Sequence, residues 1–292
     1  MQQKTFLFIL LAVTAIIWGS AFVFVDVAIK DGSSPIMLSM ARFVVASLIF
    51  GAYLLVRRPS GVDREDRKSF LMLAFIGVGI YFILQYIGIG LAGASISAIL
   101  VFLLCPVMIF VLSARRLGEK ISGEEKVGLA IAACGSVLVI TNGSISFISE
   151  WPLIVGGLLQ VICAFFWAVY TVEGKKVVMK YDPIASTAYI TIIGTIMMVP
   201  FAVTDAVITV QAFPVSFFVA ALYVGVLCTV IGYVFWFRAL TGLAASVTGA
   251  TMYFMPIVTI IFAWMMLGDT IGWVSGMGGA LTAVGVIIIS RK

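Results

Sequence analysis

Long apolar runs, separated by short polar stretches, follow one another along the whole chain. A helix that crosses the roughly 30 Å hydrocarbon core of a bilayer needs about 20 mostly apolar residues. Ten runs are predicted to be such membrane-spanning helices: residues 6–29, 35–56, 70–91, 95–112, 127–141, 153–178, 183–204, 216–237, 244–267 and 271–290. The pattern predicts an all-α integral membrane protein with ten transmembrane helices and no room for a separate soluble domain.

The composition agrees with a membrane protein and limits the kinds of metal site and catalytic site that the side chains could form. Of the 292 residues, 63% are hydrophobic and 11% are charged, with a mean hydropathy of +1.21, whereas a soluble domain is typically about 45–50% apolar and about 25% charged. The chain has no histidine, the side chain that most often serves as metal ligand and general base. The four cysteines lie within apolar runs and are interpreted as small buried hydrophobes. We therefore expect no metal site, no cofactor and no enzymatic activity.

The positions of the basic residues predict the orientation. Short loops rich in lysine and arginine stay on the cytoplasmic side of a membrane. With ten spans, sixteen of the 18 lysines and arginines fall on the side of the two termini, whereas Lys30 falls on the other side and Arg42 lies within a span. This bias predicts a multi-pass protein of the cell (inner, cytoplasmic) membrane with both termini in the cytoplasm.

The two halves of the chain resemble each other at an offset of about 150 residues. Leu117-Gly118-Glu119 recurs as Leu267-Gly268-Asp269, and Pro106 recurs as Pro256. Each half holds five predicted spans, an odd number, so the second copy must enter the membrane in the opposite orientation. We therefore predict two inverted five-helix repeats, residues 1–142 and 143–292. Inverted repeats are typical of secondary transporters, which bind substrate near the bilayer midplane between the repeats.

Several of these motifs resemble those of the EamA family in the drug/metabolite transporter superfamily. The stretch Trp18-Gly19-Ser20-Ala21-Phe22, the triplet Ala41-Arg42-Phe43 and the Leu-Gly-Glu ending of the fourth span carry the resemblance, which covers essentially the whole chain. It implies ten helices in two repeats and the export or exchange of small metabolites, often amino acids. The second repeat departs from the pattern, because Ala168-Val169 replaces Gly-Ser and Tyr189 stands near the position where arginine is expected.

Polar and aromatic side chains recur on one face of several predicted spans. Tyr81 and Gln85 are one helical turn apart, and Gln160, Trp167 and Tyr170 fall on one stripe of the sixth span. Because buried tyrosine and glutamine need hydrogen-bond partners, we interpret such residues as the lining of a cavity; the alternative is that they join helices. The predicted lining is Trp18, Tyr81, Gln85, Phe102, Gln160, Trp167, Tyr170, Tyr233, Met252 and Tyr253.

Two charged residues and two prolines within the spans are further candidates. Asp26 and Arg42 lie at similar depth near the outer end of the first two spans, where an ionisable group costs about 2.5–3.5 kcal/mol. They are predicted to pair, either as a structural salt bridge or as an outer gate and anchor for a substrate carboxylate. Pro106 and Pro256 interrupt the fourth and ninth spans and are predicted to act as hinges.

These features together predict a secondary transporter that works by alternating access. An aromatic, amphipathic cavity without a deep carboxylate suits neutral or zwitterionic metabolites with an apolar part, and the resemblance adds amino acids, including aromatic ones, as exported substrates. Without histidine and without a central carboxylate, facilitative transport is expected. The alternatives are a sugar or nucleoside carrier of the same fold, and a non-transporting scaffold or receptor. The expected partners are a small-molecule substrate and the lipid bilayer, with no nucleic acid, and the chain is expected to function as a monomer.

Overall fold

The computed structural model of the chain describes residues 2–141, 151–208, 213–267 and 273–290, and these residues form helices with no strand. Eight of the helical stretches are long and apolar enough to cross a membrane: Gln3–Lys30, Pro35–Arg57, Arg67–Ala94, Leu100–Leu117, Trp151–Val178, Pro183–Ile208, Val215–Leu240 and Ala245–Met266. The all-α, multi-pass membrane fold is confirmed at this level. The helix Gly123–Thr141 and the shorter apolar helix Gly276–Ile289 are the candidates for the remaining two predicted spans.

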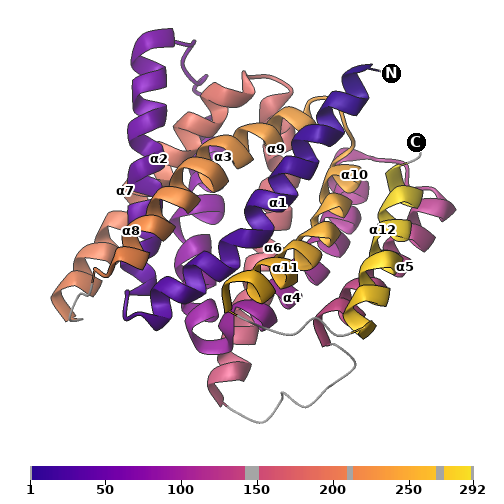
Figure 1. Cartoon of the computed structure of the whole chain (residues 1–292). Coiled ribbons are helices and arrows are strands. Elements are labelled where there is room, and N and C mark those ends of the chain that lie inside the picture. Colours follow the sequence, from indigo (N-terminus) through magenta and orange to yellow (C-terminus); the bar gives the residue numbers. More distant parts are fainter. Residues whose placement is uncertain (1, 142–150, 209–212, 268–272, 291–292) are drawn as a thin grey trace.

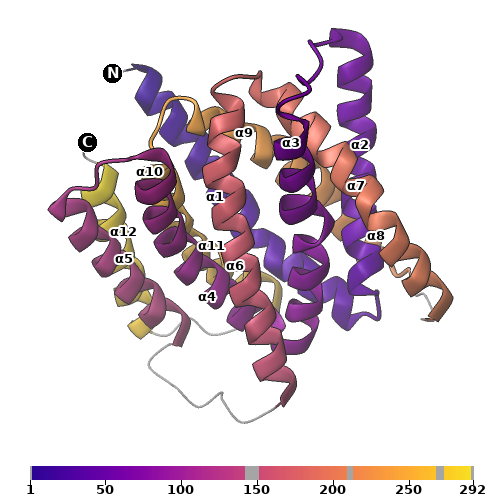
Figure 2. The ribbon, with the colours of Figure 1, turned by 180° about the vertical axis from the view of Figure 1, so that it is seen from behind.

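The helices pack as one bundle (Figure 1). The first half of the chain forms α1 (Gln2–Lys30), α2 (Pro35–Arg57), α3 (Arg67–Ala74), the π-helix η1 (Phe75–Gly79), α4 (Tyr81–Leu117) and α5 (Gly123–Thr141). The second half forms α6 (Trp151–Val178), α7 (Pro183–Ile208), α8 (Val215–Leu222), the π-helix η2 (Tyr223–Ile231), α9 (Gly232–Leu240), α10 (Ala245–Ala250), the 3₁₀-helix η3 (Thr251–Phe254), α11 (Met255–Leu267) and α12 (Trp273–Ser290). The start of α1 and the end of α12 point toward the same end of the bundle (Figures 1 and 2).

A single glycine divides the longest helix at a predicted boundary. Within α4, Gly93 has φ 78° and ψ 165°, a conformation that glycine adopts without the steric cost that a Cβ would add. The break falls between the predicted spans 70–91 and 95–112, so these two spans meet there with almost no connecting loop. The helix α4 is consequently kinked at Gly93.

The second helix of each predicted repeat begins in the same way. The Ser34 hydroxyl accepts hydrogen bonds from the backbone N–H groups of Ile36 and Met37, directly before Pro35. At the corresponding place the Asp182 carboxylate accepts from the N–H groups two and three residues further on, at 3.0 and 2.9 Å, directly before Pro183. A capping side chain followed by proline at the first helical position is a strong helix start, which explains why α2 and α7 begin where the sequence predicts.

The helices α5 and α12 form a pair at the periphery of the bundle (Figures 1 and 2). Their glycines allow the two backbones to touch. A Cβ added at Gly285 would lie 2.4 Å from the backbone nitrogen of Ala132, and one added at Gly135 would lie 2.5 Å from that of Thr282. Small residues permit such close approach between membrane helices, so this pair is built for packing, away from the cavity described below.

We therefore expect Gly285→Val to lower the free energy of unfolding by about 1–3 kcal/mol, the usual range for overpacking. The measurement is the thermal unfolding midpoint in detergent. Gly276→Val on the same helix is the matched control, because a Cβ at Gly276 meets nothing within 4 Å. Equal unfolding midpoints for the two variants would contradict the close packing of α5 on α12.

Candidate functional site

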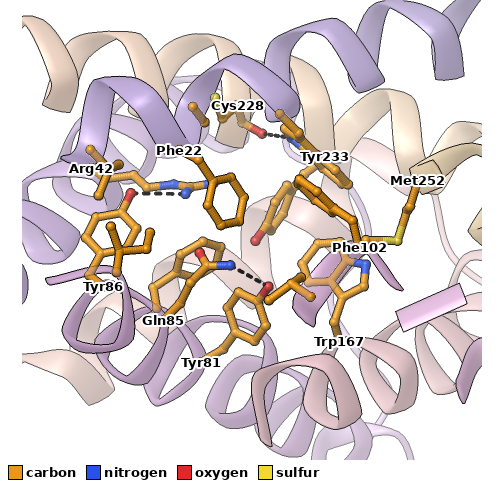
Figure 3. Close-up of a pocket in the computed structure, with 16 residues that line it drawn as sticks. Phe22, Arg42, Tyr81, Gln85, Tyr86, Phe102, Trp167, Cys228, Tyr233 and Met252 are labelled. Carbon is orange, nitrogen blue, oxygen red and sulfur yellow. Dashed lines mark hydrogen bonds between the residues drawn. The ribbon is translucent and has the colours of Figure 1, made fainter. Parts of the chain in front are cut away.

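A cavity lies where α1, α2, α4, α6, η2, α9 and η3 meet (Figure 3). It is lined by Trp18, Ala21, Phe22, Val25, Arg42, Tyr81, Phe82, Gln85, Tyr86, Ile89, Val101, Phe102, Trp167, Cys228, Tyr233 and Met252. Arg42 and Tyr86 lie toward one end, and Trp167 and Met252 toward the other. About 50 Å³ is open to the centre of a water molecule, room for about three to five waters at roughly 10–15 Å³ each. The described conformation is therefore nearly closed around the site.

Seven of the ten predicted lining residues lie on this cavity, and the other three are buried close by. Gln160 donates to the carbonyl of Gln85 at 2.9 Å, between α6 and α4. Tyr170 packs beside Trp167, with 5.2 Å between ring centroids. The Tyr253 hydroxyl donates to the Leu103 carbonyl at 3.4 Å. The structure thus brings the predicted set together, and the binding of substrate by these residues stays a prediction.

Arg42 supplies the charge of the cavity. Its side chain is buried, its Nε donates to Thr229 Oγ1 at 2.7 Å, and one terminal nitrogen donates to the Tyr86 hydroxyl at 3.3 Å. The guanidinium carbon lies 4.0 Å from the ring centroid of Phe82, a cation–π contact. A guanidinium has five N–H donors, so the described hydrogen bonds leave donors available to a ligand.

The predicted ion pair between Asp26 and Arg42 is wrong. Asp26 pairs instead with Lys30, one turn further along α1, at 2.7 Å. The reason is geometric, because Lys30 lies on the same helix face as Asp26 whereas Arg42 points across the bundle to Thr229 on η2 and to Tyr86 on α4. Among the lining residues that the structure describes there is no carboxylate. Arg42 is therefore a buried cation without an acidic partner in the cavity wall.

The π-helix η2 sets the geometry around Arg42. The N–H of Gly232 donates to the carbonyl of Leu227, five residues earlier, and this wider turn leaves the Cys228 carbonyl to accept from Trp18 Nε1 at 2.9 Å. In the same segment Thr229, the acceptor for Arg42, donates to the Val224 carbonyl at 3.0 Å. Short π-segments inside helices often occur at functional sites. Here the π-helix anchors both Trp18 and Arg42.

The two tryptophans at corresponding positions of the predicted repeats meet in the cavity wall. The rings of Trp18 and Trp167 lie edge to face, with centroids 5.1 Å apart and planes at 88°. Tyr233 and Trp236 extend this contact, at 5.7 and 5.2 Å from Trp18. Close approach also depends on Gly232, because a Cβ there would lie 2.3 Å from Trp18 Nε1. The wall is therefore closely packed and aromatic.

Glu119, which the sequence shows only as part of the repeated Leu-Gly-Glu motif, connects three helices at one end of the bundle. Glu119, just after α4, accepts hydrogen bonds from Lys175 of α6 at 2.9 Å and from the N–H of Ala245 at 2.7 Å. It also accepts from the N–H and the hydroxyl of Ser246, at 3.1 and 2.9 Å. Lys175 donates in addition to the Leu243 carbonyl at 2.9 Å. We call Glu119, Lys175, Ala245 and Ser246 the latch.

The two prolines predicted as hinges lie in different settings. Pro106 is inside α4, in the part that follows Gly93. Pro256 is the second residue of α11, which directly follows the 3₁₀-helix η3, and proline costs a helix little near its start. A hinge function of either residue stays a prediction. Across the described residues, no group of three or more Cys, Asp and Glu side chains could hold a metal ion.

Comparison with known proteins decides the family. Residues 5–141 and 154–291 each match the EamA-like transporter family. The chain belongs to the EamA-like transporter family. A solved crystal structure with 19% identity, covering 95% of this chain and 96% of its own, superposes with a TM-score of 0.74, and this likeness shows the fold.

Several transporters are similar to this chain over nearly the full length. An uncharacterized transporter of Archaeoglobus fulgidus is 30% identical, covering 100% of this chain and 99% of its own. A probable terminal-alkyne amino-acid exporter of Streptantibioticus cattleyicolor is 28% identical, covering 97% of this chain and 92% of its own. The inner membrane transporter YedA of Escherichia coli is 22% identical, covering 94% and 87%. The chain is therefore a multi-pass membrane transporter of the EamA type.

Proposed function

We propose that this EamA-family protein exports amino acids, aromatic ones included, across the cytoplasmic membrane. The observation that carries the proposal is the central cavity, which combines apolar and aromatic walls with one buried cation, Arg42. A buried charge without an opposite charge beside it is costly. A substrate carboxylate would offset that cost, and a guanidinium matches a carboxylate with two parallel hydrogen bonds.

The ammonium group and the side chain of an amino acid would also contact suitable groups of the cavity wall. Gln85 donates to the Tyr81 hydroxyl at 2.8 Å through its amide nitrogen, and its carbonyl oxygen is an acceptor for an ammonium group. Aromatic faces attract the same ammonium. Phe22, Phe102 and Met252 supply an apolar wall for the side chain. Sugars and nucleosides, the alternative substrates, carry no carboxylate and would leave Arg42 unpaired.

Transport through such a site requires alternating access, because the cavity as described is smaller than an amino acid. We propose that ten spans form two inverted repeats, residues 1–142 and 143–292, with both termini in the cytoplasm and with the monomer as the functional unit. The separate matches of residues 5–141 and 154–291 to one family support the division. Positions 150 residues apart, Phe102 and Met252, both line the cavity, which supports a site between the repeats.

The latch supports a closed cytoplasmic side in the described conformation. In the proposed orientation, Lys175 lies at the cytoplasmic end of α6. Between the latch and the cavity lie Tyr170 and Phe237, both buried, with ring centroids 5.3 Å apart. Opening of this side would require the latch contacts to break and these rings to separate.

We further propose that transport is facilitative. The described lining contains no carboxylate and the chain has no histidine, so the cavity offers no group that readily exchanges a proton near neutral pH. The relative from Streptantibioticus cattleyicolor, named as a probable amino-acid exporter, supports amino acids as the substrate class.

The test is counterflow in proteoliposomes with a panel of labelled amino acids. We expect saturable counterflow of L-phenylalanine, L-methionine or L-threonine that an imposed proton gradient does not change. Empty liposomes are the control. Saturable flux of a sugar or a nucleoside, with no flux of any amino acid, would overturn the proposal and favour the alternative carrier.

A further inference from the structure

Four buried hydrogen-bond donors without a partner gather on one side of the cavity. They are Trp167 Nε1, the Tyr170 hydroxyl, the Tyr233 hydroxyl and Trp236 Nε1. Each side chain is at most 3% exposed. We propose that these four groups form a second substrate site, here called the donor site, which binds the carboxylate of the substrate on its way between the cytoplasm and Arg42. This inference rests on the proposed function.

The four side chains form one contiguous cluster from two helices. The ring of Trp167 lies 5.2 Å from Tyr170, 5.6 Å from Tyr233 and 6.0 Å from Trp236, measured between centroids. Tyr170 and Tyr233 are 6.1 Å apart. A small group that enters between α6 and α9 would therefore meet the side chains that carry these donors.

The chemistry of the donors determines what they can bind. An indole N–H can only donate a hydrogen bond, and a tyrosine hydroxyl can donate as well. Folded proteins satisfy roughly 90% or more of their buried polar groups, so four unpaired donors in one cluster require an explanation. The group that would satisfy them is a hydrogen-bond acceptor with more than one oxygen, and a carboxylate fits this description.

The position of the cluster places it on the transport path. Trp167 and Tyr233 line the cavity, whereas Tyr170 packs on Phe237, which fills the space next to Gly174, directly before Lys175 of the latch. The donor site thus extends from the cavity wall toward the latch. In the proposed orientation, a substrate from the cytoplasm reaches it after the latch opens and before it reaches Arg42.

The donor site and Arg42 differ in charge, and this difference suits a sequence of two binding steps. The four donors are neutral, so they hold a carboxylate more weakly than a guanidinium does, because a guanidinium adds the attraction of an opposite charge and two parallel hydrogen bonds. A substrate would therefore bind the donor site loosely and move on to Arg42. Loss of the donor site should then change the KM for substrate that enters from the cytoplasm more than the KM for substrate that enters from outside.

The test removes hydroxyl groups while keeping the rings. We expect the double variant Tyr170→Phe/Tyr233→Phe to raise the KM for labelled L-phenylalanine about ten-fold in everted membrane vesicles, where the cytoplasmic face is outside, because two hydrogen bonds are lost. In right-side-out vesicles the KM should change less than about two-fold. Tyr181→Phe is the matched control, because its hydroxyl lies outside the cavity and already donates to the Asp66 carboxylate at 2.6 Å. It should leave both KM values unchanged.

A second measurement separates binding from simple packing. If the hydroxyls have no ligand, their removal should raise the thermal unfolding midpoint and leave both KM values unchanged, because unpaired buried polar groups destabilise a protein. That result would overturn the donor site while amino-acid flux by the wild type persists. Absence of amino-acid flux in the wild type would overturn the proposed function and the donor site together.

Discussion

Replacement of Arg42 by glutamine is expected to raise the KM for L-phenylalanine about 30-fold or more. Loss of one partner from a buried, hydrogen-bonded charge pair costs about 2–5 kcal/mol, and each 1.4 kcal/mol is about ten-fold in affinity. The measurement is counterflow with L-phenylalanine and with phenylalaninamide, which has the same ring and ammonium group but no carboxylate. The variant should lose the preference for the carboxylate and transport the two compounds with similar KM values.

The stability of the same variant separates a binding function of Arg42 from a structural one. Since a buried cation without an acidic partner is costly, Arg42→Gln should not lower the thermal unfolding midpoint. Thr229→Val is a graded control, because it keeps the guanidinium and removes its Thr229 acceptor, together with the Thr229 hydrogen bond to the Val224 carbonyl. It should raise the KM by about five-fold, as for one hydrogen bond to Arg42. A variant that unfolds at lower temperature but keeps the wild-type KM for L-phenylalanine would show that Arg42 serves the fold alone.

Replacement of Glu119 by alanine is expected to have the largest effect on stability, about 3–5 kcal/mol. The carboxylate accepts four hydrogen bonds, from Lys175, from Ala245 and twice from Ser246, and Lys175 is itself largely buried, with 18% of its side chain exposed. Removal of one partner from such a pair leaves the other charge uncompensated. The measurement is the thermal unfolding midpoint. Glu65→Ala is the control, because Glu65 is exposed, and equal midpoints for the two variants would contradict the latch.

The latch should also depend on pH in a defined direction. Burial raises the pKa of Glu119, but the hydrogen bonds from Ala245, Lys175 and Ser246 lower it more, so the net pKa lies below its ordinary value of 4.5. A carboxylate of this kind adds stability above its ordinary pKa, and the stability is lost as the pH falls through the lower folded pKa. The unfolding midpoint of the wild type should therefore fall more steeply below about pH 4.5 than that of Glu119→Gln.

The hydrophobic pattern predicted the helices well because bilayer thickness sets their length. The capped starts of α2 and α7, at Ser34 and Asp182, lie next to prolines that the sequence shows directly. The break at Gly93 also falls at a predicted boundary. Trp18 and Trp167, both predicted from the helix faces to line a cavity, lie on one cavity in the structure although they are 149 positions apart in the chain.

The partners of the charged residues could not be predicted in the same way. Depth in the membrane suggested that Asp26 pairs with Arg42, but depth does not reveal which face of a helix a side chain occupies, and Asp26 pairs within α1. The π-helix that presents Thr229 to Arg42 depends on backbone hydrogen bonds that no side-chain pattern encodes. Glu119 contacts backbone groups 126 positions further along the chain, a distance at which sequence spacing carries no geometric information.

The role of Arg42 in substrate selection is tested by comparing counterflow of L-phenylalanine with that of phenylalaninamide by the wild-type protein. We expect saturable counterflow of L-phenylalanine, with phenylalaninamide neither exchanged nor an effective competitor, because only the former carries a carboxylate for Arg42. Equal exchange of the two compounds would contradict the central claim that the cavity of this EamA-family transporter selects its substrate through that carboxylate.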